Sequence, residues 1–397
     1  MIDLSAEAKP RNLVALCDGT RNHLGDDLTN IARLFRCLDR DATQQVFYNS
    51  GVGTIGGDMW WSQRARSVKA LFEQATGYAI DRDILAIYRF ICANYQDGDR
   101  IWLFGFSRGA YTVRIVAALL HMVGVLPKDQ IELSGYALSY LKAISERDGE
   151  ADKADFDRVY GFARIAGARR VSIWFLGLFD TVSSLILPER NGPFPGLATL
   201  PCTRKNKSVR VVRHAAAIDE RRALFRLNRW TEPQPFVPNP FRPEIEEPQD
   251  VKQVWFAGVH ADIGGGYPEA KSSLAKVPLL WMIQEAQAHG LRLSHRRIDR
   301  FVRGERADDN GRFVKPSFNG DLHDSMPGHG FFEYIPKARD FAETRKPIWP
   351  LYLPLAEPRA LTRTSPRPRV HQGVFDRIAA GGYIPVNLPT AVEVEPW

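Results

Sequence analysis

Apolar runs alternate with segments of helical periodicity along most of the chain. The apolar runs are rich in β-branched and aromatic residues and occupy 12–17, 45–49, 101–104, 171–179 and 251–257. Helical spacing of apolar positions occupies 30–38, 80–93, 131–147, 220–227, 278–288 and the segment after residue 107. Near-continuous apolar strands are typical of a sheet that is covered on both faces. The pattern therefore predicts an α/β fold with a mainly parallel central sheet flanked by helices.

Two proline-rich stretches interrupt this alternation and are predicted to be loop insertions. They lie at about 185–208 and 230–248, and the second contains six prolines. Proline at this density excludes regular helix or strand, and long ordered loops in compact domains are often lids or binding loops. We predict one α/β domain over 10–300, which holds both insertions, and a C-terminal extension over 301–397 that packs on the same domain.

Composition places the chain among ordinary soluble globular proteins. Its 397 residues are 44% hydrophobic and 25% charged, and this length allows a large core. The four cysteines are far apart and form no C-x-x-C pair, which favours a reducing compartment over a zinc site or a disulfide framework. The acidic N-terminus has no apolar core. We therefore expect a chain that is cytoplasmic as synthesised, with export open to a system that needs no signal peptide.

Positive charge is concentrated in one part of the C-terminal extension. Residues 337–371 hold eight basic and three acidic side chains, whereas the whole chain has a net charge of +7. This stretch is predicted to be a solvated surface segment, with peripheral contact to an anionic membrane as the functional alternative. Nucleic acid is disfavoured as a partner because no recognition motif accompanies the charge.

The most informative motif is a serine between two glycines at a predicted strand-to-helix turn. The apolar run 101–104 leads into Gly105-Phe106-Ser107-Arg108-Gly109, and helical periodicity follows. This is the nucleophile-elbow pattern of α/β-hydrolases, in which the glycines avoid collision with the neighbouring strand and helix. Ser107 is therefore predicted to be a catalytic nucleophile, with Gly105 and Gly109 as the elbow glycines.

A serine nucleophile needs a base, and the base needs an acid that orients it. The order along the chain in α/β-hydrolases is Ser, Asp, His. Asp180 and His260 each come at the end of an apolar strand run, where parallel sheets bind their ligands. Both are therefore predicted to be catalytic. His323 is the alternative base, and Asp262 is the alternative acid.

An acyl-transfer site also needs hydrogen-bond donors for the oxyanion of the tetrahedral intermediate. One donor is predicted to be the backbone N–H of Arg108, the residue after the nucleophile. The second is predicted in the loop after the first strand, where Gly19 or Thr20 can offer an amide. A simple tight turn is the alternative interpretation of that loop.

These motifs belong to a longer ordered series along the chain. The series comprises 17–22, 29–31, 48–54, 105–110, 177–182, 213–215 with 219–222, and 254–267. It resembles the uncharacterised α/β-hydrolase domain family that includes phospholipase effectors of bacterial type VI secretion. Cys17 and Arg21 stand where this family usually has an aromatic pair.

The resemblance implies catalytic roles for Ser107, Asp180 and His260. It also implies a phospholipid or another carboxylic ester as the substrate. A secretion machine or an immunity protein would then be a partner of the chain.

Three other interpretations are open. Gly51 to Gly56 match the dinucleotide pattern G-x-G-x-x-G, but the expected helix and the acidic strand end do not follow. Asp18, His260 and Asp262 could hold a divalent ion in a metal-dependent hydrolase, which leaves the serine elbow without a role. A non-catalytic lipid- or protein-binding module on a hydrolase scaffold is the third. We predict a phospholipase- or lipase-type serine acyl hydrolase that uses no metal or other cofactor.

Overall fold

A computed structural model describes most of the chain. The described residues are 10–19, 27–51, 78–145, 153–182, 185–188, 195–198, 200, 202–239, 242, 244–306, 312–326, 330–337, 342–344, 352–363 and 365–397. The Gly51 to Gly56 pattern therefore lies almost entirely outside them.

One eight-stranded sheet forms the centre of the molecule, in the order β12-β11-β10-β7-β4-β3-β1-β2. All of its neighbouring strands are parallel. The strands are β1 (Asn12–Cys17), β2 (Gln44–Asn49), β3 (Arg100–Phe106), β4 (Ile173–Phe179), β7 (Val209–Ala217), β10 (Asp250–Phe256), β11 (Arg369–His371) and β12 (Glu393–Glu395). The predicted α/β-hydrolase-like fold with a mainly parallel sheet is confirmed.

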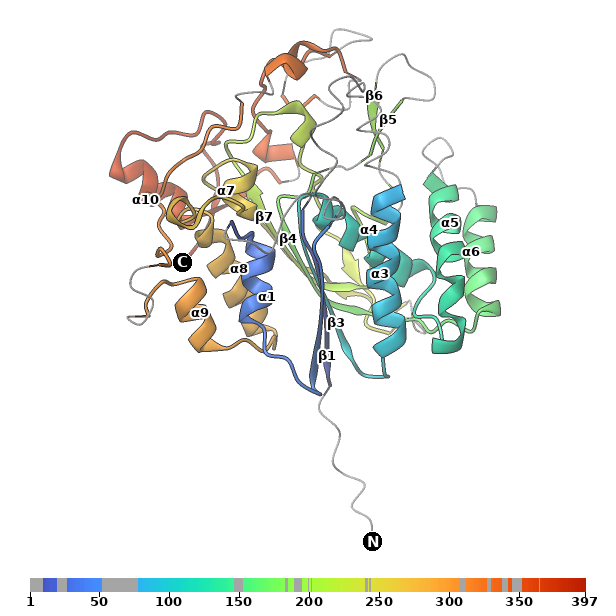
Figure 1. The fold of residues 1–397 in the computed structure, drawn as a ribbon. Coiled ribbons are helices and arrows are strands. Elements are labelled where there is room, and N and C mark those ends of the chain that lie inside the picture. The colour runs from blue at the N-terminus through green and yellow to red at the C-terminus, as the bar shows by residue number, and fades with distance from the viewer. Residues whose placement is uncertain are drawn as a thin grey trace, which may run out of the picture.

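Helices cover both faces of this sheet (Figure 1). One face carries α1 (Asn30–Cys37), α8 (Lys276–Ala288) and α9 (His295–Phe301). The other face carries α3 (Tyr78–Asn94), α4 (Arg108–Met122), α5 (Ser134–Ser145) and α6 (Lys153–Ile165). The short helix α7 (His260–Gly264) follows β10, and α10 (Gln372–Ala380) follows β11. Among the described residues, no helix is long and apolar enough to cross a membrane.

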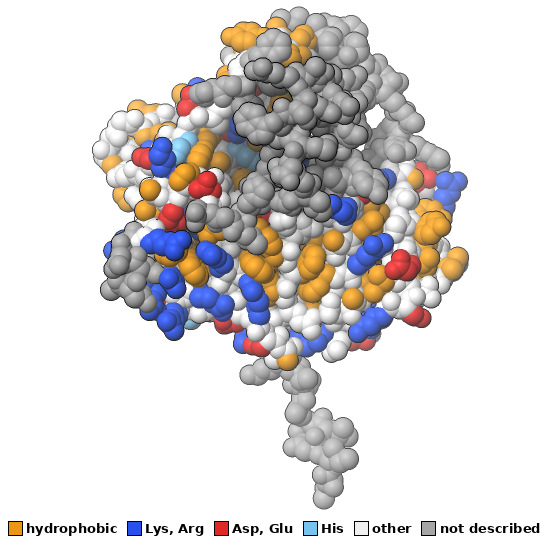
Figure 2. Space-filling model, in the orientation of Figure 1, with side chains coloured by type: hydrophobic (Ala, Val, Ile, Leu, Met, Phe, Trp, Pro, Cys, Tyr) orange, Lys and Arg blue, Asp and Glu red, His pale blue; other side chains and the backbone are white. Residues whose placement is uncertain are grey.

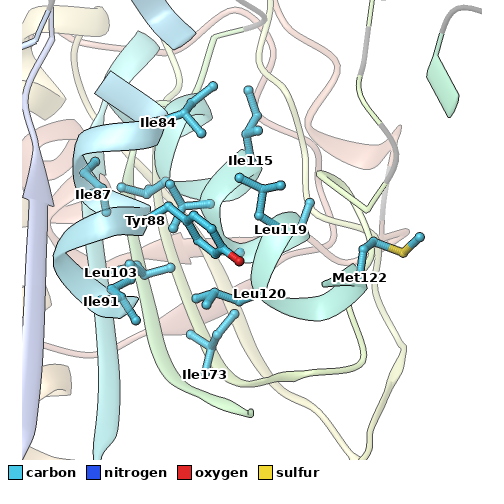
Figure 3. Packing of buried hydrophobic residues seen from close by; sticks show 14 of the residues in the cluster. Ile84, Ile87, Tyr88, Ile91, Leu103, Ile115, Leu119, Leu120, Met122 and Ile173 are labelled. Atoms are coloured by element: carbon cyan, nitrogen blue, oxygen red, sulfur yellow. The ribbon is translucent and has the colours of Figure 1, made fainter. Parts of the chain in front are cut away.

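Each face of the sheet buries its own apolar core. On one side, side chains of α3 and α4 interdigitate over β3 and β4 (Figure 3). On the other side, Trp102, Phe104 and Phe175 pack as neighbouring rings beneath α1 and α8. Burial on both faces explains why these strands are apolar at nearly every position.

The sequence pattern missed one central strand and misplaced one helix. β7 lies between β4 and β10, but Arg213 and His214 interrupt its apolar run. Both are buried in the sheet with polar partners that are distant in sequence. The helix predicted over 220–227 is wrong, because only a 3₁₀ turn forms there, over Ala223–Phe225.

The two predicted insertions contain short strands, contrary to the prediction. β5 (Leu185–Pro188) pairs with β6 (Pro195–Ala198), and β8 (Pro235–Phe236) pairs with β9 (Glu247–Pro248), both antiparallel. These are isolated two-stranded ladders, and proline is tolerated in them because an edge strand leaves some of its N–H positions unpaired.

The basic stretch 337–371 does not form the predicted surface segment throughout. Lys337 and Arg359 are buried, and Arg369 forms ion pairs with Glu393 and Glu395. Figure 2 shows the basic side chains of the whole chain on one face of the molecule. Lys and Arg side chains are spread over its lower half among neutral and hydrophobic ones. The prediction of a solvated surface segment is therefore wrong for its buried members.

Asn12 joins three strands at the end of the sheet where β1 begins. Its Nδ2 donates to Gln44 Oε1 (2.9 Å), and its Oδ1 accepts from Trp102 Nε1 (3.0 Å). We expect Asn12→Ala to lower the free energy of unfolding by about 1–3 kcal/mol, because the buried Trp102 Nε1 loses its acceptor and Gln44 Oε1 loses one of its two donors. Urea denaturation would measure this change. Ser139→Ala is the control, since this exposed hydroxyl bonds only its own helix, and it should change stability by less than about 0.5 kcal/mol.

Candidate active site

The turn after β3 holds Ser107 at the carboxyl end of the sheet in a conformation that few residues adopt. Ser107 has φ 58° and ψ −123°, and its N–H donates to the carbonyl of Phe179 on the neighbouring strand (3.0 Å). A Cβ on Gly109 would lie 2.3 Å from the carbonyl oxygen of Cys17, and one on Gly105 would lie 2.6 Å from the backbone of α4. Glycine is required on both sides of the serine because the backbones approach this closely.

Hydrogen bonds join Ser107, His260 and Asp180 in a continuous chain. Ser107 Oγ lies 2.8 Å from His260 Nε2, and His260 Nδ1 lies 2.5 Å from Asp180 Oδ2. With the carboxylate as acceptor, Nδ1 carries the proton and Nε2 can accept the proton of the serine hydroxyl. All three residues are buried. The structure thus brings together a hydroxyl, a base and an acid from three separate parts of the chain.

His260 is fixed through its backbone and its ring. It begins α7, and its N–H donates to Glu220 Oε2 (3.1 Å). The ring lies beside Phe106, with centroids 4.8 Å apart, and meets Phe225 edge-on at 4.9 Å. Glu220 is held in turn by Arg222, whose Nη2 donates to Oε2 (2.8 Å). These contacts leave the imidazole little freedom to turn away from Ser107.

The start of α1 supports the helix that carries His260. Asn30 Nδ2 donates to the carbonyl of Ile263 in α7 (2.8 Å) and to a second carbonyl just before α8. Thr29 caps α1, and its hydroxyl donates to Asp18 Oδ2 (2.5 Å). These contacts give Thr29 and Asn30 a structural role in holding the site together.

The backbone N–H groups of Arg108, Gly19 and Thr20 are the predicted oxyanion donors, and the outcome differs for each of them. Arg108 begins α4 directly after Ser107, so its N–H stays a predicted donor. The amide of Gly19 donates to Asp18 Oδ1 (2.7 Å), and this bond would have to be exchanged before Gly19 could serve an oxyanion. Thr20 lies outside the described residues.

Asp180 is fully buried and carries a partner that the sequence did not reveal. Burial by itself raises the pKa of this carboxyl, but the Arg359 guanidinium and the His260 hydrogen bond outweigh it and hold the pKa well below its ordinary value. Arg359 donates to both carboxylate oxygens, at 2.6 and 3.0 Å. The backbone N–H of Ala217 donates to Oδ1 as well (2.9 Å). Asp180 therefore stays an anion although no bulk water surrounds it.

Sequence reasoning missed Arg359 and Glu220 as site residues. Arg359 was counted in the basic stretch, and no motif around it indicates a site. Glu220 lies in the predicted helix 220–227 and was noted only as part of the family resemblance. Both contacts span large separations in sequence, which periodicity does not detect.

The two alternative site residues bind each other. His323 Nδ1 lies 2.6 Å from Asp262 Oδ1, and the His323 ring stacks on Tyr267 with centroids 3.7 Å apart. Asp262 Oδ2 also accepts the N–H of Val259 (3.0 Å). Asp262 belongs to α7, two residues after His260. Of the two histidines, it is His260 whose ring nitrogens hydrogen-bond Ser107 and Asp180.

The predicted metal ligands do not gather into a binding site. Both ring nitrogens of His260 are engaged by Ser107 and Asp180. Across the part of the chain that the structure describes, no group of three or more His, Cys, Asp or Glu side chains is arranged to hold a metal ion.

A cavity of about 280 Å³ opens beside the His260 loop. Val259, the residue before His260, forms part of its wall, and the other lining residues come from the loop after β7 and from the segment around His323. Its lining is mixed: Leu322, Met326 and Val259 are apolar, whereas Asp219, Arg221, His323, Asp324 and Ser325 are polar.

Solved structures and curated proteins resemble this chain over part of their length. The uncharacterized protein YEL023C of Saccharomyces cerevisiae is 31% identical over 260 residues, which cover 60% of this chain and 35% of the relative. A crystal structure of an uncharacterized protein from Pseudomonas aeruginosa is 19% identical, with a TM-score of 0.42, and the match covers 77% of this chain and 49% of that one. The structure of the Tle1 effector bound to the VgrG spike of the type VI secretion system is also 19% identical, with a TM-score of 0.31. This match covers 67% of this chain and 53% of that one.

The chain thus spans about a third of the length of its curated relative and about half of the solved structures. Residues 11–285 match the family described as the type VI secretion phospholipase effector Tle1-like catalytic domain. This match includes Ser107, Asp180 and His260 and covers well over half of the chain. The protein therefore belongs to the family of Tle1-like phospholipase effector catalytic domains.

Proposed function

We propose that the protein is a serine acyl hydrolase that cleaves carboxylic ester bonds of phospholipids. The observation that carries this proposal is the hydrogen-bond chain from Ser107 through His260 to Asp180 at the elbow after β3. The strained backbone of Ser107 supports it, because such strain persists where the surrounding structure requires it and is often found at reactive residues. Membership of a phospholipase effector family supports a phospholipid as the substrate.

In the proposed reaction His260 Nε2 accepts the hydroxyl proton of Ser107 while Oγ attacks the ester carbonyl. The N–H of Arg108 and a second amide, that of Gly19 or Thr20, stabilise the oxyanion. The imidazolium then gives its proton to the departing alcohol oxygen, and an acyl-serine remains. Water next loses a proton to His260 and attacks the acyl-serine, which releases the carboxylic acid and restores the hydroxyl. Asp180 keeps the proton on Nδ1 throughout and stabilises the imidazolium.

Family membership also suggests how the protein meets its partners. Because the family is that of type VI secretion effectors, we propose that the protein contacts this secretion machine and is exported by it without a signal peptide. We also propose an immunity protein as a binding partner. Peripheral contact with an anionic membrane is a further proposal. Arg363 and Arg367 are exposed members of the basic stretch and are available for such contact.

Activity on lipid vesicles tests the proposed reaction. We expect the purified protein to release fatty acid and lysophospholipid from mixed phosphatidylcholine and phosphatidylglycerol vesicles, as identified by mass spectrometry. Ser107→Ala should lower kcat by about 10⁴-fold or more, because the nucleophile is lost. A fluorophosphonate probe should form an adduct on Ser107.

Ser208→Ala is a matched control for this experiment. The Ser208 hydroxyl also lies 2.7 Å from a histidine nitrogen, on His121, but no carboxylate of the described residues hydrogen-bonds that pair. The activity of Ser208→Ala, and the labelling of Ser107 in this variant, should equal those of the unaltered protein. Vesicle binding without hydrolysis and without a Ser107 adduct would instead establish a lipid-binding module.

Chelation separates the serine mechanism from a metal-dependent one. The predicted reaction uses only side chains and backbone amides of the protein, so incubation with EDTA followed by gel filtration should leave kcat/KM on a soluble p-nitrophenyl ester unchanged. Activity that is abolished by the chelator, restored by a divalent cation and retained by Ser107→Ala would contradict the serine mechanism.

A further inference from the structure

Arg359 comes from the C-terminal part of the chain and binds the acid of the proposed triad. Its guanidinium is fully buried, and Nη1 and Nη2 donate separately to Oδ1 and Oδ2 of Asp180. The same nitrogens donate to the carbonyls of Ala217 (3.0 Å) and Phe225 (2.5 Å). Such a bidentate contact fixes both the position and the orientation of a carboxylate.

The backbone around Arg359 is anchored on both sides. Asn387 Nδ2 donates to the carbonyl of Arg359 (2.9 Å). Arg229 Nη2 donates to the carbonyl of Ala360 (3.0 Å), and Glu343 Oε2 accepts its N–H (3.0 Å). Arg359 is therefore a rigid support for Asp180, although it lies outside the residues 11–285 that match the family.

Other charged groups near the site are already offset by partners of their own. Burial lowers the pKa of His214 to about 3, so this histidine is neutral at working pH. Glu220 is paired with Arg222 at 2.8 Å, and Glu343 is paired with a neighbouring arginine at 2.7 Å. The charge that acts most directly on Asp180, besides His260, is therefore that of Arg359.

We propose that Arg359 is a positioning residue of the triad, which orients Asp180 toward His260 and offsets part of its negative charge. This inference rests on the proposed acyl hydrolase function. An uncompensated carboxylate beside the imidazole stabilises the imidazolium, which cannot accept the serine proton. A guanidinium on the same carboxylate weakens this effect.

The pH profile of kcat/KM tests this role on a soluble p-nitrophenyl ester between pH 4 and 9. We expect Arg359→Met to lower the plateau about 10- to 100-fold, by analogy with the loss of other groups that orient a catalytic residue. Its acid limb should move to higher pH by about one unit, because the positive charge is lost. Arg359→Lys keeps the charge but not the bidentate contact, so its plateau should fall while its acid limb stays in place.

Arg213→Met is the matched control. Arg213 is also buried, and its Nη1 and Nη2 donate to the two carboxylate oxygens of Asp250. Its other side-chain partner, Glu285, also lies outside the triad. Arg213→Met should destabilise the fold and leave the acid limb unchanged. An Arg359→Met profile that keeps the wild-type limb, or an equal shift in Arg213→Met, would overturn the proposal.

Two further outcomes are distinguishable. If Arg359→Met does not fold, as judged by circular dichroism, Arg359→Lys decides the question, and a wild-type plateau in that variant contradicts the positioning role. The rate of fluorophosphonate labelling of Ser107 provides a second readout of the same pH profile. Absence of labelling in the unaltered protein would instead reject the acyl hydrolase function itself, and the role of Arg359 with it.

Discussion

The environment of the Asp180 carboxylate is the constraint on which the rest of the site depends. An anion removed from water is costly unless charge and hydrogen bonds replace its hydration. Here a guanidinium, an imidazole N–H and a backbone N–H supply that replacement. Together they outweigh the effect of burial on the pKa of the carboxyl. The acid is thereby kept ionised and in place, and His260 is kept in the tautomer that faces Ser107.

The parallel sheet explains how residues distant in sequence reach one point. β3, β4, β7 and β10 are consecutive neighbours, and their carboxyl ends lie along one edge. Ser107, Asp180 and His260 follow three of these strands. The fourth, β7, contributes none of these three residues but ends at Ala217, whose N–H donates to Asp180, and leads to Glu220, which accepts the backbone N–H of His260. The site thus needs all four strands in register.

Sequence patterns indicate those features of the candidate site that are local. Ser107 lies between glycines at a turn bounded by an apolar strand and a helix, and all of this is visible within about fifteen residues. Asp180 and His260 are predicted to be site residues because each comes at the end of an apolar run. The family resemblance then agreed with this order, and the family is now established by the match over 11–285.

What the sequence could not predict depends on pairs of distant polar residues. The strand β7 is concealed by Arg213, whose charge is tolerated in the sheet because Asp250 and Glu285 bind it. Arg359 looked like one member of a basic surface stretch, although its partner lies 179 residues earlier. Hydrophobic periodicity assigns a charged residue to the protein surface. That assignment is wrong for a residue in a buried ion pair, because its charge is then offset inside the protein. Only the three-dimensional partner distinguishes the two cases.

Buried ion pairs also tie the C-terminal segment to the site. Arg226 binds Glu357, and Arg229 binds Glu343, so arginines after β7 hold carboxylates of the C-terminal segment. Arg359 makes the reverse connection, from that segment to Asp180. Breaking one side of such a pair leaves an uncompensated charge and typically costs about 3–5 kcal/mol. The segment therefore cannot separate from the sheet without exposing or orphaning several charges at once. Assembly of the acid–base pair is for this reason coupled to folding of a part of the chain that lies beyond the residues shared with the family.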